Sequence, residues 1–268
     1  MSELKEVLAV VNNKGGVAKT TTVQSIAAAL MERDAQTKVL VIDLDPQANL
    51  STLCGWKPGE GRRTMFNALR GGKPMPVYKS ARGIYYAPSA PELQDIDADL
   101  FRAMQPKQVL MECFAQNVDD QTGEGLTDIT RDFDYILIDC PPAMSQTTYN
   151  AMAVASGLLI PVQMEGLSVS GLGTILVEMN RVQRGLNKTL ELRGILPVMV
   201  DSRPRIVRGL FDYLHESYEE RLLNTYIRRC VKINEAQNDC RDIFEYAPDC
   251  NAARDYAALV EELFPVEE

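Results

Sequence analysis

The sequence predicts an α/β protein with a doubly wound, mainly parallel sheet flanked by helices. Three observations support this fold class: short apolar runs alternate with longer helix-like segments, several runs are continuous, and charged motifs come directly after some of them. Continuous apolar strands are expected where helices cover both faces of a sheet. In such sheets, ligands bind beyond the carboxyl ends of the strands, so the motifs fall where a site is expected.

Seven apolar runs are the expected strands. In chain order they are Val7–Val11, Val39–Ile42, Ile84–Ala87, Tyr135–Ile138, Leu158–Val162, Leu192–Val200 and, with a weaker pattern, Leu222–Ile227. Helices are expected at Thr20–Arg33, Gln146–Ala155, Val169–Leu186 and Ile206–Tyr218, with a short one near Met65–Leu69. No internal repeat or interdomain linker is visible. We therefore expect one domain over residues 1–268, without a separate N-terminal helix-turn-helix domain.

Composition restricts the classes of function. The chain has 268 residues, of which 46% are hydrophobic and 24% charged, as in an average globular protein. No apolar stretch approaches the roughly 20 residues needed to span a bilayer, and the start of the chain lacks signal-peptide features. We expect a cytoplasmic protein. The six cysteines include no Cys-x-x-Cys pair and there is one histidine, so a zinc site or a disulfide framework is not expected.

The first expected strand leads into a glycine-containing loop and then a helix, as a phosphate-binding loop requires. Glycines let successive backbone N–H groups point at phosphate oxygens, and the helix N-terminus adds the positive end of its dipole. Asn13 and Ala18 stand where the usual P-loop has glycine, so the loop fits the deviant pattern Lys-Gly-Gly-x-x-Lys-[Ser/Thr] instead. The predicted nucleotide-binding residues are Lys14, Gly15, Gly16, Val17, Ala18, Lys19, Thr20 and Thr21.

With this pattern, the chain resembles the ParA/MinD group of P-loop ATPases, and the ParA-type partition ATPases most closely. The resemblance implies that Lys14 crosses a dimer interface to contact the phosphates of the partner's nucleotide. Lys19 is expected to reach the β- and γ-phosphates of ATP, and the Thr20 hydroxyl to ligate Mg²⁺. Ala18 replaces a glycine common in the group, so we expect nucleotide binding to be retained and leave the catalytic rate open.

Carboxylates follow two other expected strands. Asp43 and Asp45 belong to an Asp-x-Asp-Pro-Gln motif that resembles the second motif of the group. The resemblance implies that Asp45 positions or activates the attacking water and that Asp43 supports Mg²⁺ and its waters; a solvated loop is the alternative. Asp139 ends an apolar strand in the Walker B arrangement, so we expect it to hold Mg²⁺ through water. The alternative for Asp139 is capping of a helix.

The charge distribution bears on a nucleic-acid partner. A net charge of −9 argues against one, but residues 181–232 hold 11 basic and 6 acidic residues, a net of +5, which leaves −14 elsewhere. Partition ATPases bind DNA without sequence preference, and arginines that contact only phosphates act in this way. The predicted DNA-binding residues are Arg203, Arg205, Arg208, Arg228, Arg229 and Lys232. The alternative is a solvated face with salt bridges to Glu216, Glu219 and Glu220.

The resemblance implies a nucleoid-associated DNA-segregation ATPase. It would dimerise on binding ATP and Mg²⁺, bind DNA, and reset on hydrolysis, with Lys14, Lys19 and Asp45 in catalysis and a ParB-type centromere-binding protein as partner. A MinD-like membrane-cycling ATPase is one alternative, although the acidic end of the chain would be repelled by an anionic bilayer. A regulatory module that binds ATP with negligible turnover is a second alternative, and a metabolic P-loop kinase or ligase is a third.

Overall fold

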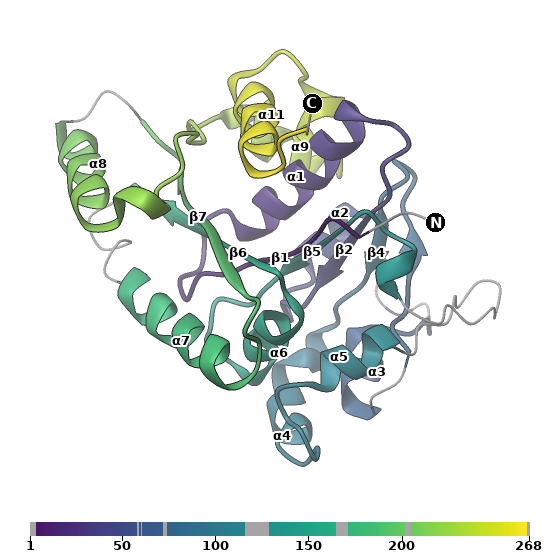
Figure 1. The fold of residues 1–268 in the computed structure, drawn as a ribbon. Coiled ribbons are helices and arrows are strands. Elements are labelled where there is room, and N and C mark those ends of the chain that lie inside the picture. Colours follow the sequence, from purple (N-terminus) through teal and green to yellow (C-terminus); the bar gives the residue numbers. More distant parts are fainter. Residues whose placement is uncertain are drawn as a thin grey trace.

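The computed structural model describes residues 4–57, 59, 61–71, 74–115, 129–164, 171–201 and 205–266. In this part of the chain, seven strands form one sheet in the order β3-β4-β2-β5-β1-β6-β7 (Figure 1). Neighbouring strands pair in parallel, except β3 with β4. The expected mainly parallel sheet is therefore confirmed. The strands are β1 (Glu6–Val10), β2 (Val39–Asp43), β3 (Tyr78–Lys79), β4 (Tyr85–Ala87), β5 (Tyr135–Asp139), β6 (Gly157–Gln163) and β7 (Glu191–Val198).

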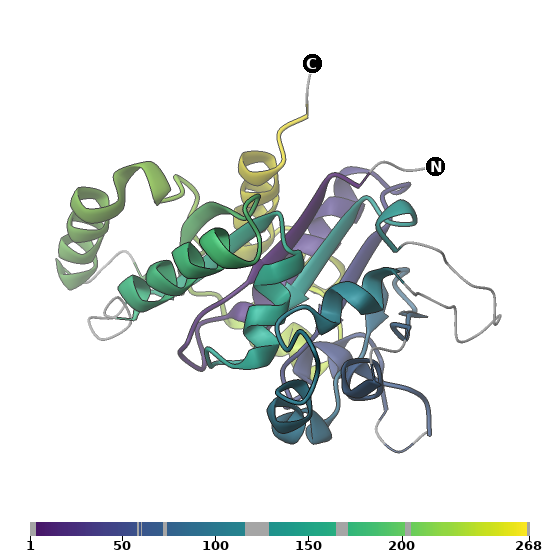
Figure 2. The same cartoon turned by 60° about the horizontal axis from the view of Figure 1, so that its bottom comes forward.

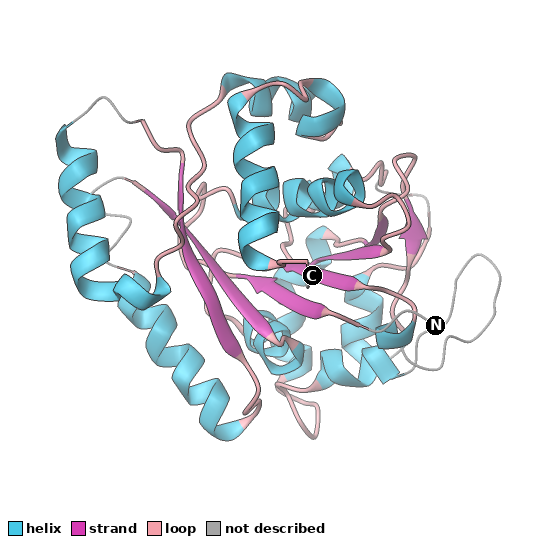
Figure 3. Ribbon diagram, turned by 45° about the horizontal axis from the view of Figure 1, so that its top comes forward, coloured by secondary structure: helices cyan, strands magenta, loops and turns pink. Residues whose placement is uncertain are grey.

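Helices cover both faces of the sheet. The α-helices are α1 (Lys19–Arg33), α2 (Asn49–Leu53), α3 (Met65–Gly71), α4 (Ile96–Leu100), α5 (Val109–Ala115), α6 (Gln146–Val154), α7 (Leu172–Gly185), α8 (Arg205–Tyr218), α9 (Val231–Asn238), α10 (Ile243–Tyr246) and α11 (Asn251–Leu263). Short 3₁₀ helices are η1 (Pro91–Asp95), η2 (Ile129–Arg131) and η3 (Glu219–Arg221). Helices α1 and α11 lie on one face, and α3 to α7 lie on the other (Figures 1 and 3).

The two helical layers explain why the central strands read as continuous apolar runs. Successive side chains of a strand point to opposite faces, so Val7 and Ala9 of β1 enter the core shared with α5 to α7. Leu8 and Val10 enter the core beneath α1 and α11. Figure 2 shows β1 (purple) and β5 (teal) running side by side between these layers. Within β1, β2 and β5, polar side chains are therefore confined to the strand ends.

One expectation needs correction. Leu222–Ile227 is not a strand: Leu222 makes only an isolated bridge to Ile195, and the N–H groups of Asn224 and Thr225 donate to the Glu262 carboxylate, each at 2.8 Å. Because these two N–H groups are bonded to the Glu262 carboxylate, they do not form the hydrogen bonds of a β-ladder. The sequence pattern also missed β3, which has two residues. Helix α7 begins at Leu172, and the first residues of the helix expected from Val169 lie outside the described part of the chain.

Candidate nucleotide-binding site

The loop between β1 and α1 lines a pocket of about 880 Å³ at the carboxyl edge of the sheet. A volume of this size suits a nucleotide. Its wall combines three segments that are distant in sequence: residues 15–21, residues 45–53, and residues 227–238 leading into α9. Asn12 anchors the start of the loop, since its side chain accepts a hydrogen bond from Lys14 N at 2.9 Å and donates to the Pro161 carbonyl at 2.7 Å.

Left-handed backbone conformations shape this pocket. Gly16 has φ 75°, which glycine adopts at no steric cost. Ala18, at the N-terminal cap of α1, has φ 59° and ψ 26°. Glycine adopts this left-handed conformation without strain, whereas the methyl group of alanine makes it unfavourable. Met199, another lining residue, has φ 54°, and Ala48 in the loop after β2 has φ 52°. Backbone strain of this kind clusters at functional sites.

Lys19 lies inside the curl of the loop. Its side chain is buried, and its Nζ donates to the carbonyl oxygen of Lys14 at 3.1 Å. Burial lowers the pKa of Lys19, and the nearby carboxylates of Asp139 and Asp45 oppose this effect. The structure therefore brings together three residues that the sequence predicted for the chemistry, and Lys19 supplies positive charge between two acids.

Asp139 is the most exceptional acid of the site. It ends β5, is 1% exposed, and neither carboxylate oxygen has a hydrogen-bond partner among the described residues. Burial raises its pKa well above the usual value, and the charge of Asp43 raises it further; the Thr20 hydroxyl beside it and the Lys19 ammonium act in the opposite direction. A buried acid without a partner needs a physical explanation, and a bound cation supplies one.

Asp43 and Asp45 have different surroundings. The carboxylate of Asp43 accepts hydrogen bonds from Asp45 N at 3.1 Å and from Ser51 N and Oγ at 2.8 and 2.7 Å. Burial raises the pKa of Asp43 to about 6, although the bonds from Ser51 lower it. Asp45 is half-buried and lines the pocket. Asp43 thus holds the loop that carries Asp45, and its predicted support of Mg²⁺ stays a prediction.

Sequence reasoning missed several residues of the site. Gln237 of α9 donates from Nε2 to Thr21 Oγ1 at 2.9 Å and so ties the far wall of the pocket to α1. Tyr256 of α11 lines the pocket and lies 3.3 Å, hydroxyl to hydroxyl, from Thr22. No local motif marks these residues, because their partners are more than 200 positions away in the sequence.

The predicted DNA-binding residues fall in two parts of the sequence, residues 203–208 and 228–232, called here the two basic segments. Val200 and Arg228 form a parallel bridge, and Arg229 N donates to the Val200 carbonyl at 3.0 Å. Hence the chain that follows β7 runs, at Val200, next to the chain that leads into α9.

Two of the six predicted DNA contacts already have acidic partners. The Arg228 guanidinium donates to both Asp255 oxygens, with Nη2–Oδ1 at 2.5 Å and Nε–Oδ2 at 3.0 Å. Lys232 pairs with Glu235 at 2.7 Å. These acids are not the ones that the alternative interpretation named, namely Glu216, Glu219 and Glu220.

The remaining predicted contacts are described less fully. Arg229 is exposed. Arg205 and Arg208 lie in the first turn of α8, where only the backbone is described, and Arg203 lies outside the described residues.

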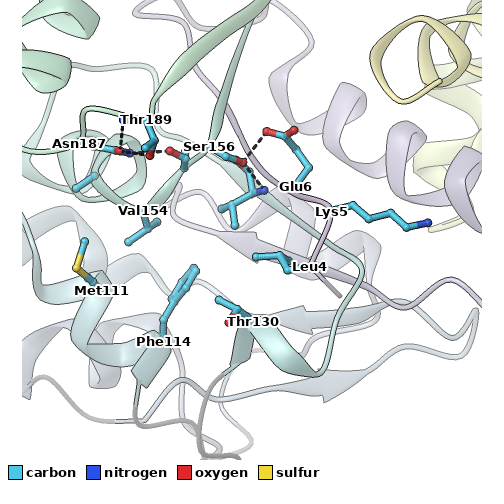
Figure 4. A pocket seen from close by; sticks show the side chains of 13 residues that line it. Leu4, Lys5, Glu6, Met111, Phe114, Thr130, Val154, Ser156, Asn187 and Thr189 are labelled. Atoms are coloured by element: carbon cyan, nitrogen blue, oxygen red, sulfur yellow. Dashed lines mark hydrogen bonds between the residues drawn. The ribbon is translucent and has the colours of Figure 1, made fainter. Parts of the chain in front are cut away.

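A second cavity, of about 550 Å³, lies at the opposite edge of the sheet (Figure 4). Its polar groups satisfy one another: Ser156 Oγ donates to Glu6 at 2.6 Å, Arg193 pairs with Glu6 at 2.6 Å, and Thr189 Oγ1 donates to Asn187 at 2.9 Å. None of the predicted site residues lines this cavity. Its polar groups hold neighbouring elements together, so they need no ligand to explain them.

Comparison with known proteins adds independent information. Residues 5–192 match the family model described as AAA domain. The chromosome-partitioning ATPase Soj of Thermus thermophilus is 31% identical over 258 residues, which cover 96% of this chain and 94% of that protein. The chromosome partitioning protein ParA of Myxococcus xanthus is 29% identical over 260 residues, covering 96% and 87%.

A solved structure extends the comparison to three dimensions. The cobyrinic acid a,c-diamide synthase of Mycobacterium smegmatis, with bound ATP analog and magnesium, is 30% identical with a TM-score of 0.79. The match covers 96% of this chain and 93% of that one. Among the residues that the structure describes, no helix has the length and apolar character needed to cross a membrane.

Proposed function

Because the chain belongs to the AAA domain family and, within it, to the ParA/MinD type of P-loop ATPase, we propose that it is a DNA partition ATPase. In this proposal it binds ATP with Mg²⁺, pairs with a second copy, binds DNA without sequence preference, and releases DNA after hydrolysis. The single observation that carries the proposal is the juxtaposition of Lys19, Asp45 and the buried Asp139 at the phosphate loop.

ATP binding is supported by the shape and charge of the pocket. The left-handed Gly16 and the N-terminus of α1 suit a phosphate chain, since both direct backbone N–H groups into the pocket. Lys19 would exchange its present contact with the Lys14 carbonyl for the β- and γ-phosphates. Residues 227–238 line the far end of the pocket and would enclose the base.

The residues present fit a magnesium ion. Asp139 offers two buried oxygens that form no hydrogen bond with the side chains or backbone of the other described residues, and the Thr20 hydroxyl lies beside them. Mg²⁺ is usually held in such sites by one or two carboxylates together with waters and phosphates. When bound, it would neutralise charge that develops on the phosphates. Asp45, which is half-buried at the same pocket, would orient the attacking water or accept its proton.

Pairing of two subunits is the role proposed for Lys14. The described lining of the pocket runs from Gly15 to Thr21 and does not include Lys14. This is consistent with a side chain that serves the nucleotide of a second copy, as the resemblance to ParA-type ATPases implies. Dimerisation would therefore depend on ATP, because the partner's phosphates would supply the counter-charge for Lys14.

DNA binding would follow from the adjacency of the two basic segments. In the sequence, Arg203, Arg205 and Arg208 follow Val200 closely and Arg229 follows Arg228, and Val200 and Arg228 are joined by a parallel bridge. Residues 227–231 also line the nucleotide pocket, so a change there on ATP binding would reach the DNA-binding segment directly. A ParB-type partner protein would stimulate hydrolysis and release, and the protein would be cytoplasmic and nucleoid-associated.

One rival has a specific observation in its favour. The similar solved structure is named a cobyrinic acid a,c-diamide synthase and holds an ATP analog and magnesium. A shared activity would make this chain a metabolic ligase. An amide ligase needs no DNA, whereas a partition ATPase needs no carboxylic substrate. Turnover of ATP that rises on addition of DNA and a ParB-type partner would support partition and exclude the ligase.

The test of the proposal is DNA binding in three nucleotide states. Fluorescence anisotropy of a labelled random-sequence duplex is measured with ATP, with ADP and without nucleotide, each with Mg²⁺. We expect binding only with ATP, and an affinity that falls steeply with salt concentration. Equal binding in all three states would refute the proposed switch.

Two lysine variants sharpen this test. Lys14→Ala should bind ATP but fail to dimerise or to bind DNA, as shown by light scattering and anisotropy. Lys38→Ala is the matched control, because Lys38 is exposed at the amino end of β2, on the opposite edge of the sheet. If both variants lose DNA binding equally, the effect is one of total charge and not of Lys14.

A further inference from the structure

Buried side chains hold the main chain of Asp45 from both sides. Its N–H donates to Asp43 Oδ1 at 3.1 Å, and its carbonyl oxygen accepts from Ser89 Oγ at 2.6 Å. Ser51 joins the two holders: its Oγ donates to Asp43 Oδ2 at 2.7 Å and accepts from Ser89 N at 2.8 Å. These hydrogen bonds form a closed ring that begins and ends at Asp45, called here the Asp45 ring.

The members of the ring come from separate elements. Ser51 belongs to α2, and Ser89 follows β4, the neighbour of β2 in the sheet. Asp43 and Ser51 are each 1% exposed and Ser89 is 0% exposed. Hydrogen bonds in such a dry environment are stronger and more rigid than those at the surface. The ring therefore fixes a strand-end loop that would otherwise be free to move.

We propose that Ser51 and Ser89 are positioning residues for ATP hydrolysis. This inference rests on the proposed function. Asp45 lines the nucleotide pocket, whereas the two serines do not appear in its described lining. They would act through Asp45, by keeping its carboxylate at the phosphate end of the pocket. Small displacements of a catalytic group lower the rate strongly, while the binding of substrate at other contacts is preserved.

The least disruptive test is Ser89→Ala. It removes one hydrogen bond but leaves the Ser89 N–H on Ser51, and the Asp45 carbonyl still accepts from Ala48 N at 2.9 Å. We expect kcat to fall about tenfold with KM for ATP changed less than about twofold. Amide hydrogen exchange in the peptide that contains Asp45 should become faster. Ser80→Ala is the control, since the Ser80 hydroxyl is buried without a partner in the described chain.

A second variant shows whether Ser89 acts through Asp45. In an Asp45→Asn background, Ser89→Ala should not lower the residual turnover further, because positioning matters only while the carboxylate is present. Additive losses in the double variant would point to a general structural effect and overturn the inference.

Hydrogen exchange is measured without nucleotide, so it reports on the ring independently of turnover. If the wild-type protein hydrolyses no ATP, the proposed ATPase function and the positioning role both fall. If the wild-type protein turns over and Ser89→Ala leaves either kcat or the exchange rate unchanged, only the positioning role falls. A lower kcat together with faster exchange, with Ser80→Ala unaffected, supports it.

Discussion

Asp43 and Asp139 are register partners at the carboxyl ends of the adjacent parallel strands β2 and β5. Each is 1% exposed, but their environments differ: Asp43 accepts three hydrogen bonds, whereas Asp139 has no partner among the described residues. Burial is the largest cause of the raised pKa of both groups. The site thus holds acidic groups at a cost in stability, as is common where a protein prepares to bind a cation.

The raised pKa values predict how stability depends on pH. A carboxyl whose pKa is higher in the folded protein favours folding most below its unfolded value of 3.8. This contribution is lost as the pH rises through the folded value, which is about 6 for Asp43. Asp139→Asn should therefore stabilise the nucleotide-free protein above neutral pH by about 1–3 kcal/mol, measured by urea unfolding, and weaken the loss of stability with rising pH.

Asp95→Asn, at an exposed position, is the control for this charge change. It should alter stability by less than about 0.5 kcal/mol. If Asp139→Asn instead destabilises the protein at high pH, the charged Asp139 carboxylate must be stabilised in the folded protein by interactions other than hydrogen bonds.

The left-handed Ala18 predicts a stabilising substitution. A side chain in this conformation destabilises the folded protein by about 1–2 kcal/mol. Glycine avoids this strain, but its more flexible unfolded state reduces the gain in stability by about 0.5–1 kcal/mol. Ala18→Gly should therefore stabilise the protein by about 0.5–1 kcal/mol, measured by urea unfolding, with ATP affinity retained. Ala27→Gly, in the middle of α1, should destabilise by about 1 kcal/mol. Equal effects of the two changes would contradict strain at Ala18.

Arg228 and Arg229 are predicted to behave differently. Arg228→Ala removes the hydrogen bonds to Asp255, which is 8% exposed, and should destabilise the protein by about 1–3 kcal/mol. Arg229→Ala should leave stability within about 0.5 kcal/mol and weaken DNA binding, with the salt dependence reduced by about one phosphate contact. Thermal unfolding and salt-dependent anisotropy separate the two effects. Loss of DNA binding in Arg228→Ala alone would show that Arg228, and not Arg229, contacts DNA.

Asp45→Asn should separate ATP binding from hydrolysis. The substitution preserves the shape of the side chain, so ATP affinity by calorimetry should change little, while kcat should fall by about 10²-fold or more. The protein would then stay on DNA in the presence of ATP. Turnover close to that of the wild-type protein would remove Asp45 from the catalytic role.

Local sequence patterns were sufficient to predict the fold class and the phosphate loop. Apolar runs such as Val7–Val11 are local signals of buried strands, and the spacing of Lys14 and Lys19 around two glycines is a local signal as well. Asp43 and Asp139 were identified by the same logic, because each directly follows an apolar run, and Asp45 was identified by its place in the Asp-x-Asp-Pro-Gln motif. Local patterns are sufficient here, since the carboxyl ends of parallel strands meet at one edge of a sheet.

The contacts between side chains that are distant in the sequence could not be predicted and are seen only in the folded chain. Arg228 is bound by Asp255 of α11, Ser89 reaches the Asp45 carbonyl from the chain after β4, and Glu262 accepts hydrogen bonds from the backbone N–H groups of Asn224 and Thr225. None of these partners lies within a local motif. Hydrogen bonds and ion pairs depend on distances of a few ångströms in space, and the packing of α11 and the strand order that create those distances are not encoded in any short stretch of the chain.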